Sequence, residues 1–87
     1  MSSPQFSLLF SLKAKKQLKT LAPSWQKQYY KAFQLLAIQG PQYRSLRTHY
    51  YRLKDRKVWG SSASMFLRFY WDYAEKATIL ILFLSNH

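Results

Sequence analysis

The segment Thr78–Leu84, with the sequence TILILFL, constrains the fold of this chain more than any other feature. A strand at the surface of a sheet alternates apolar and polar side chains, whereas this segment is apolar on both faces. Such a segment fits a central strand that is buried between neighbouring strands. It is also too short to cross a membrane, because a spanning helix needs about 20 apolar residues. The rest of the chain must therefore supply the neighbours in a sheet.

Four further segments have the composition of strands: Gln5–Phe10, Leu46–Tyr51, Val58–Ser64 and Leu67–Trp71. The last of them alternates large apolar residues with polar ones, so Arg68 is expected on the face opposite Leu67 and Phe69. Asp72–Ala77 carries two of the three acids. We interpret it as a hairpin turn in front of the central strand.

Two amphipathic helices are predicted between the first strand and the others. From Ser11 onward, apolar residues recur at helical spacing while lysines fill the outer face. A second helix begins near Pro23 and is stopped by Gly40-Pro41, a glycine cap followed by proline. Only a few residues link the helices, so they should form an antiparallel hairpin. The predicted order is β-α-α-β-β-β, an α+β fold with an antiparallel sheet and the helical hairpin packed on one face.

The balance of charge is the second strong constraint. The chain has 14 lysines and arginines against 3 acidic residues, a net charge of +11 over 87 residues. Such a charge makes a polyanion the default partner, and nucleic acid is the commonest one. The lack of cysteine excludes disulfides and thiolate zinc sites, and two histidines alone do not favour a metal site. Phe6–Phe10 does not resemble a signal peptide, so we expect a cytoplasmic protein with no membrane, metal or small-molecule cofactor.

The positive charge is concentrated between residues 44 and 57. This basic run contains Arg44, Arg47, Arg52, Lys54, Arg56 and Lys57. His49, Tyr50 and Tyr51 are interleaved with these cations. Cations that neutralise phosphates, beside rings that stack on unpaired bases, favour single-stranded RNA over duplex DNA. The alternative is a solvated surface whose tyrosines support the sheet. Further RNA contacts are expected from the first helix, at Lys15, Lys16 and Lys19.

The inventory of reactive side chains excludes most familiar catalytic sites. Three acids do not provide a triad or a catalytic carboxylate pair, and two glycines cannot form a glycine-rich phosphate loop. Arginine, lysine, histidine and tyrosine do suit one reaction, the attack of an RNA 2′-hydroxyl on its adjacent phosphate. That step needs a proton acceptor, a proton donor and cations around the phosphorane. The RNA supplies the nucleophile, so serine, cysteine and metal are not required.

Arg68, His49 and His87 are the candidates for this chemistry. Arg68 lies in a strand, where a charge is costly unless it faces solvent or a ligand. Its alternative role is that of an ordinary outward-facing arginine. His87 ends the last strand and could act as an acid or base, but chain ends usually fray, which favours no role. His49 lies in the basic run, where a surface histidine more often has no catalytic role.

Several short segments resemble toxins of the RelE/ParE superfamily. Lys15–Ser24 resembles their lysine-rich first helix and the proline-containing link after it, and Leu46–His49 resembles the segment that leads into their sheet. Val58–Trp59 and Leu67–Trp71 resemble the family's aromatic strand and its arginine-bearing strand. Leu80–His87 resembles the last strand and the terminal segment. The resemblance extends over nearly the whole chain and implies a single RelE-like toxin domain over residues 1–87.

This resemblance implies the toxin of a type II toxin–antitoxin pair. In the RelE-like branch, which it favours, the toxin is a ribosome-dependent, metal-independent mRNA endonuclease that inhibits translation. Arg68 matches the strand arginine that stabilises the scissile phosphate, and His87 lies where relatives carry a basic side chain or histidine. The basic run would hold mRNA and ribosomal RNA. The implied partners are a cognate antitoxin, the ribosome and mRNA.

Two departures from the family leave the chemistry open. Gly60 and Ser62 stand where some RelE members have catalytic lysines, and the glutamate base of the YoeB-like branch has no evident counterpart. Either His49 or Lys54 supplies the base, or the site is weakened and the chain only binds its antitoxin. A further alternative is a ParE-like inhibitor of DNA gyrase, because the same fold serves both branches.

Overall fold

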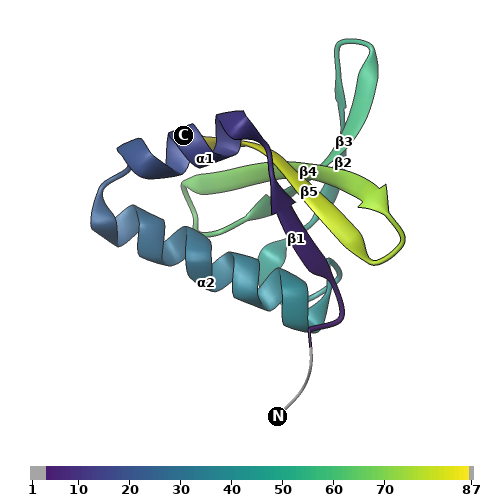
Figure 1. Cartoon of the computed structure of the whole chain (residues 1–87), viewed down its shortest axis with the longest axis horizontal. Helices are drawn as coiled ribbons and strands as arrows, with labels where there is room; N and C mark the ends of the chain where they lie inside the picture. The colour runs from purple at the N-terminus through teal and green to yellow at the C-terminus, as the bar shows by residue number, and fades with distance from the viewer. Residues whose placement is uncertain (1–3, 87) are drawn as a thin grey trace.

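The computed structural model describes residues 4–86. Along the chain its elements are β1 (Ser7–Phe10), α1 (Leu12–Thr20), α2 (Pro23–Gln39), the 3₁₀ turn η1 (Arg44–Leu46), β2 (His49–Leu53), β3 (Arg56–Ser62), β4 (Leu67–Glu75) and β5 (Thr78–Asn86). Figure 1 shows α1 and α2 following one another against the sheet, with the β2–β3 hairpin projecting away from both. The α+β fold with a helical hairpin is confirmed.

The five strands form one mixed sheet in the order β1-β5-β4-β3-β2. β5, which contains TILILFL, lies between β1 and β4, as its apolar pattern predicts. Two details differ from the predicted order β-α-α-β-β-β with an antiparallel sheet. Four strands follow the helices, one for each of the four segments predicted there and one more than the predicted order contains. β1 pairs parallel with β5, Ser7 opposite Thr78. Side chains alternate identically in either strand direction, so the pattern does not reveal the direction of β1.

Beyond the end of β1, helix α1 takes over the outer edge of β5. β1 pairs with β5 only as far as Ile81, so the next residues of β5 have no strand on that side. Ser11, the N-cap of α1, donates its hydroxyl to the carbonyl of Leu82. The Gln17 amide donates to the Leu84 carbonyl at 3.0 Å and accepts from the Leu84 N–H at 2.7 Å. The side-chain amide of Gln17 thus continues the row of hydrogen bonds that β1 makes along the edge of β5.

The core lies between α2 and the sheet face that carries Leu67, Phe69 and Trp71, all three of which are buried. Phe33 of α2 meets Phe69 edge-on, with 5.0 Å between the ring centroids. As predicted, a glycine stops α2, because the φ of 91° at Gly40 lies in a region that side chains disfavour.

The two strands of the β2–β3 hairpin start elsewhere than predicted. The strand expected at Leu46–Tyr51 starts only at His49, because η1 first buries Leu46 in the core. The strand expected at Val58–Ser64 is β3, which both begins and ends two residues earlier. The turn between the strands is therefore at residues 54 and 55, at the far end of the hairpin.

The acidic segment Asp72–Ala77, expected to be a turn, is mostly strand. β4 continues to Glu75, and the turn comprises only Lys76 and Ala77. A left-handed φ of 60° at Ala77 reverses the chain there. Glu75 is exposed at the end of the strand. An acidic residue is tolerated there because it is solvated, so its presence does not indicate a turn.

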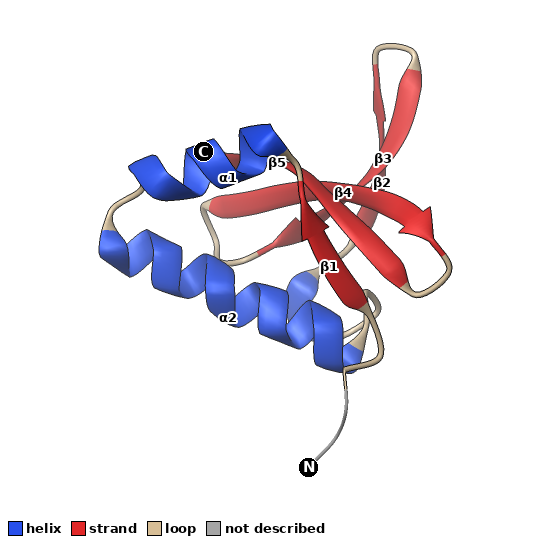
Figure 2. Ribbon diagram, viewed as in Figure 1, coloured by secondary structure: helices blue, strands red, loops and turns tan. Residues whose placement is uncertain are grey.

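The other face of the sheet is not covered by α2, and we call it the open face. Arg68 and Tyr70 lie on it, as the alternation along β4 predicts. Tyr51 of β2 and Phe83 of β5 lie on it as well, in contact with these two residues. In Figure 2 α2 runs along one side of the sheet, while α1 lies beside β5. The open face is where the candidate site forms.

Candidate active site

Arg68 lies near the start of β4 with its side chain half-buried. Its Nη1 donates a hydrogen bond of 3.0 Å to the hydroxyl of Tyr51. Its Nε is fully buried and has no hydrogen-bond partner within residues 4–86. A buried donor without an acceptor costs about 1–3 kcal/mol, and a bound ligand is one reason for a fold to keep one. Tyr51 thus holds one end of the guanidinium in place, while the buried Nε meets no acceptor.

Tyr29 of α2 supports the backbone beneath Arg68. Its hydroxyl lies 2.9 Å from the carbonyl oxygen of Arg68 and 3.0 Å from that of Ser85, the opposite residue in β5. Burial raises the pKa of Tyr29 to about 12, so the phenol keeps its proton and donates at neutral pH. The helix therefore ties β4 to β5 at the position of the candidate arginine.

Tyr51 reaches Arg68 by crossing over Gly60 of β3. A Cβ atom on Gly60 would lie 2.5 Å from Cε2 of Tyr51 and 2.9 Å from Cε1 of Tyr70, closer than real contacts allow. The φ of Gly60 is not positive, so this glycine supplies space and not backbone freedom. The space above Gly60 is filled by the ring of Tyr51 from the neighbouring strand.

Aromatic rings continue from Tyr51 across the open face. Tyr51 meets Tyr70 edge-on at 5.5 Å between ring centroids, and Tyr70 stacks on Phe83 at 4.8 Å. Nζ of Lys13 lies 5.2 Å from the centre of the Phe83 ring, within the range of a cation–π contact. The row of rings joins β2, β4 and β5 and packs beside Arg68.

A cleft of about 620 Å³ opens beside Arg68. Its lining comes from η1 and the residue after it, from β2 and β3, and from β4 with the segment before it: Ser45, Arg47, His49, Tyr51, Ser62, Ser64, Met65 and Arg68. Arg47 and Arg68 bring two cations together, and His49 adds a group that can accept or give a proton. His49 and Tyr51 are two residues apart on β2, so they share a face. The cleft can therefore bind a phosphate and exchange protons with it.

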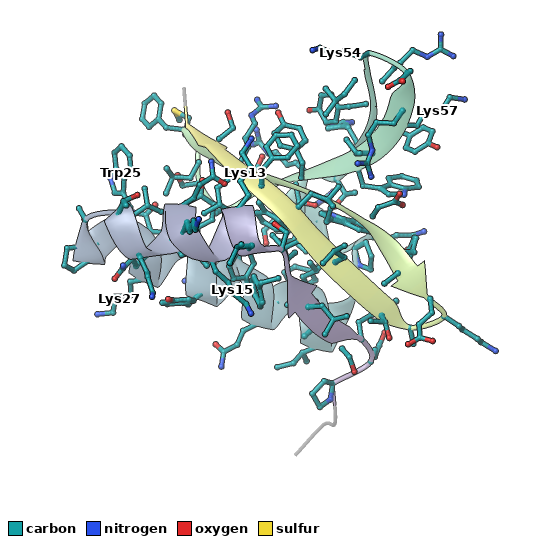
Figure 3. The ribbon with its side chains drawn as sticks, turned by 45° about the horizontal axis from the view of Figure 1, so that its top comes forward. Lys13, Lys15, Trp25, Lys27, Lys54 and Lys57 are labelled. Atoms are coloured by element: carbon teal, nitrogen blue, oxygen red, sulfur yellow. The ribbon has the colours of Figure 1, made fainter. Side chains whose placement is uncertain are left out.

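The cations at the tip of the β2–β3 hairpin lie away from this cleft. Exposed side chains surround the turn, at Arg52, Lys54, Arg56 and Lys57. Figure 3 shows Lys54 and Lys57 at the far end of the hairpin. Of the two candidate bases, the structure brings His49 to Arg68 and leaves Lys54 in the turn.

Tyr50 and Arg44 belong to the opposite side of the sheet from Tyr51. Tyr50 packs on Trp59 at 4.5 Å between ring centroids, and Nζ of Lys57 lies 5.8 Å from the centre of the Tyr50 ring. Arg44 lines a second cavity, of about 400 Å³, together with Arg47 and Trp59. Two tyrosines that are adjacent in sequence thus serve different faces.

The lysines of the first helix form another separate surface. The three that are expected to contact RNA, Lys15, Lys16 and Lys19, are exposed on α1, as is Lys13. In Figure 3 Lys13 and Lys15 lie well apart from Lys54 and Lys57. The remaining candidate, His87, lies outside the described residues, so its expected role stays a prediction.

Tyr70 and Lys13 lie on the open face beside the cleft although the sequence did not single them out. Gly60 was noted only for the lysine that it lacks, not for the space that it provides. The alternation along β4 places Tyr70 on the face of Arg68 and is the signal that could have found it. Lys13 and Gly60 depend on which elements become neighbours in space. The sequence carries no local signal of that kind.

The cleft is lined by positively charged side chains and by hydroxyl groups. Within residues 4–86, no three His, Cys, Asp or Glu side chains come together in a way that could hold a metal ion. Arginines with hydroxyl groups around them suit an anionic ligand such as phosphate. In the same range of residues no helix has the length and apolar character needed to cross a membrane.

The sequence matches no protein-family model and no curated protein. Solved structures do share its fold. RelE of Pyrococcus horikoshii OT3, in complex with RelB, has a TM-score of 0.76 at 12% identity, with 94% of each chain covered. YoeB from Staphylococcus aureus has a TM-score of 0.74 at 12% identity, covering 95% of this chain and 98% of that one. A metal-bound toxin from Helicobacter pylori has a TM-score of 0.72 at 20% identity, with 94% of each chain covered.

These similarities define the class of fold. The chain has the fold of the RelE-like toxins of toxin–antitoxin systems over nearly its whole length. At identities of 12% and 20% the likeness concerns the backbone, and one fold supports more than one activity. What the protein does therefore rests on the side chains of its own cleft.

Proposed function

We propose that this chain is the toxin of a type II toxin–antitoxin pair and that it cleaves mRNA on the ribosome without a metal ion. The observation that carries the proposal is the cleft in which Arg68, Arg47, His49 and Tyr51 converge. The fold that the chain shares with RelE and YoeB supports it. The protein would act in the cytoplasm, where cutting messages stops translation.

The RNA supplies the nucleophile of the reaction. His49 accepts the proton of a 2′-hydroxyl, whose oxygen forms a bond to the adjacent phosphorus. Arg68 and Arg47 stabilise the negative charge that builds on the phosphoryl oxygens. The P–O5′ bond then breaks and the 5′-oxygen takes up a proton. The products are a 2′,3′-cyclic phosphate and a new 5′-hydroxyl end.

The guanidinium of Arg68 suits this task better than an ammonium group. Its planar set of donors matches two phosphate oxygens at once, whereas lysine acts as a point charge. Nη1 is held by Tyr51, and the buried Nε has no partner within the described residues. The bond to Tyr51 thus orients the group, and the guanidinium donors that face the cleft are the ones that would meet the phosphate.

The hairpin tip extends the contact surface beyond the cleft. Four exposed cations, Arg52, Lys54, Arg56 and Lys57, surround one acid, Asp55. Charges of this kind bind phosphates of any sequence, and their affinity falls as salt is added. The tip would contact ribosomal RNA while the cleft holds the message.

A cognate antitoxin is the second proposed partner. RelE of Pyrococcus horikoshii and the RelBE2 toxin of Mycobacterium tuberculosis were each solved as toxin–antitoxin complexes. For this chain, whose net charge is +11, we expect an acidic antitoxin with an amphipathic helix that neutralises the basic surfaces. An acidic protein encoded beside this gene should copurify with it.

Primer extension on an mRNA translated in a cell-free system tests the activity. The wild-type protein should cut within codons only during translation, and Arg68→Ala should abolish the cuts while remaining folded. Lys31→Ala, an exposed cation on α2 far from the cleft, is the matched control and should cut like wild type.

Three other outcomes would overturn all or part of the proposal. Cutting by Arg68→Ala at the wild-type rate would remove Arg68 from the site. No cuts with folded wild-type protein, together with inhibition of purified DNA gyrase, would favour the ParE-like alternative. If the protein neither cuts nor inhibits gyrase but binds its antitoxin, it is an inactive relative.

A further inference from the structure

We propose that Tyr51 is a catalytic residue of this site and donates the proton that the leaving 5′-oxygen takes up. The inference rests on the proposed RNA cleavage and assigns its missing general acid. Tyr51 comes from β2, and it enters the cleft through the space that Gly60 leaves open on β3. The glycine is thus a requirement of this arrangement.

The hydrogen bonding of Tyr51 leaves its proton available. Its oxygen accepts the hydrogen bond from Nη1 of Arg68 at 3.0 Å, which occupies a lone pair and not the O–H. Among residues 4–86 no acceptor is found for that O–H. A phosphate bound by the Arg68 guanidinium would lie next to the same hydroxyl. The cation also stands beside the oxygen on which negative charge develops when the proton leaves.

The ring of Tyr51 is held in one orientation before any ligand binds. It lies over the backbone of Gly60, meets Tyr70 edge-on at 5.5 Å, and meets the ring of His49 at 6.5 Å between centroids. Neighbours on three sides, with a hydrogen bond at the tip, fix the position of the hydroxyl. A group fixed during folding needs no further ordering during the reaction, which lowers the barrier.

Acid and base then come from the same strand. His49 and Tyr51 occupy one face of β2 and both line the cleft with Arg68. His49 takes the proton of the 2′-hydroxyl as the O2′–P bond forms. As the P–O5′ bond breaks, its electron pair goes to the 5′-oxygen, which takes the proton of Tyr51. The imidazolium of His49 afterwards returns a proton to the phenolate through solvent, and both groups are reset.

Tyr51→Phe tests the role of the hydroxyl, because it keeps the ring that covers Gly60. General acid catalysis contributes about 10²–10⁴-fold, so cleavage of a synthetic mRNA on programmed ribosomes should slow by about that factor. Tyr30→Phe removes an exposed phenol from α2 and is the matched control. It should cut at the wild-type rate.

A second substrate separates proton donation from positioning of Arg68. In an mRNA with sulfur in place of the scissile 5′-oxygen, the leaving group departs without a proton. On this substrate Tyr51→Phe should approach the rate of wild type to within about tenfold, because the general-acid contribution is no longer needed. A loss that is equally large on both substrates would show that Tyr51 only positions Arg68, and would overturn the assignment.

The remaining outcomes distinguish this inference from the proposed function. If wild-type protein cuts and Tyr51→Phe cuts equally fast on the oxygen substrate, the general-acid role is wrong while the function stands. If wild-type protein does not cut either substrate, the proposed function itself fails, and the inference falls with it.

Discussion

Replacing Gly60 with alanine tests the packing on which the cleft depends. In the interior of a strand, alanine is normally favoured over glycine by about 0.5–1 kcal/mol, because glycine loses more backbone freedom on folding. At this position the new methyl group would meet Tyr51 at 2.5 Å and Tyr70 at 2.9 Å. Overpacking costs about 1–3 kcal/mol. The two effects together span about 0–2.5 kcal/mol of destabilisation. Because the methyl group would meet two rings, we expect Gly60→Ala to cost more than about 0.5 kcal/mol.

The cheapest relief of the clash is for the half-buried ring of Tyr51 to swing away from β3. That movement breaks its hydrogen bond to Arg68 and should also reduce cleavage. Urea unfolding followed by tryptophan fluorescence measures the stability. Thermal unfolding is a second measurement of the same loss. For a chain of this size, 1 kcal/mol corresponds to a shift of about 4–8 °C in melting temperature. Ser62→Ala, on the same face of β3, is the matched control and should change stability by less than about 0.5 kcal/mol.

A double-mutant cycle identifies Tyr51 as the source of the cost. In a Tyr51→Ala background, Gly60→Ala should be less destabilising by about 1 kcal/mol or more, since residues in contact show coupling energies of this order. Part of the cost should remain because Tyr70 is still there. A Gly60→Ala protein as stable as wild type, or more stable, would show that the ring does not lie over Gly60. The account of the cleft would then be wrong.

Three further predictions concern the elements that hold the site in place. Gln17→Met removes both hydrogen bonds to Leu84 and should lower the free energy of unfolding by about 1–3 kcal/mol. Hydrogen exchange at the Leu84 amide should speed up, and exchange as slow as in wild type would contradict the edge role of α1. Ser61→Ala leaves the buried indole N–H of Trp71, now bonded to Ser61 at 2.9 Å, without that acceptor, at a cost of about 1–3 kcal/mol; a neutral result in urea unfolding would count against this hydrogen bond. The pKa of Tyr29 is about 12 when folded and about 10 when unfolded, so the folded state holds the proton more tightly and stability falls as pH rises from about 10 to 12. Tyr29→Phe should lose less stability than wild type across that window, and parallel unfolding curves would refute the burial argument.

Alternation along the strands allowed the face of Arg68 to be predicted, but not its surroundings. Leu67 and Phe69 turn into the core and Arg68 turns away, as period-two spacing requires. That spacing says nothing of which strand lies alongside. Arg68 lies on β4 and Tyr51 on β2, so their contact crosses β3 at Gly60. Only the order and register of the sheet bring these three residues together.

The choice between His49 and Lys54 shows the same limit. Both lie in the basic run and both could serve as a base. The position of the hairpin turn separates them in space, because Lys54 has a left-handed φ of 50° in that turn, while His49 pairs with Gly60 inside the sheet. The sequence placed the first strand of the hairpin three residues too early, at Leu46, because it could not show that η1 buries that leucine first.

The basic and aromatic run does not act as one surface, although its composition invites that interpretation. Tyr50 pairs with Trp59 and packs on it, whereas Tyr51 pairs with Val58 and turns toward Arg68. A nucleotide stacked on Tyr50 would therefore lie on the opposite side of the sheet from the cleft. Tyr50 can stack on a base outside the cleft, while Tyr51 is already engaged by Arg68 and Tyr70. Loss of the Tyr50 ring should accordingly weaken RNA binding, and loss of the Tyr51 hydroxyl should slow the chemical step.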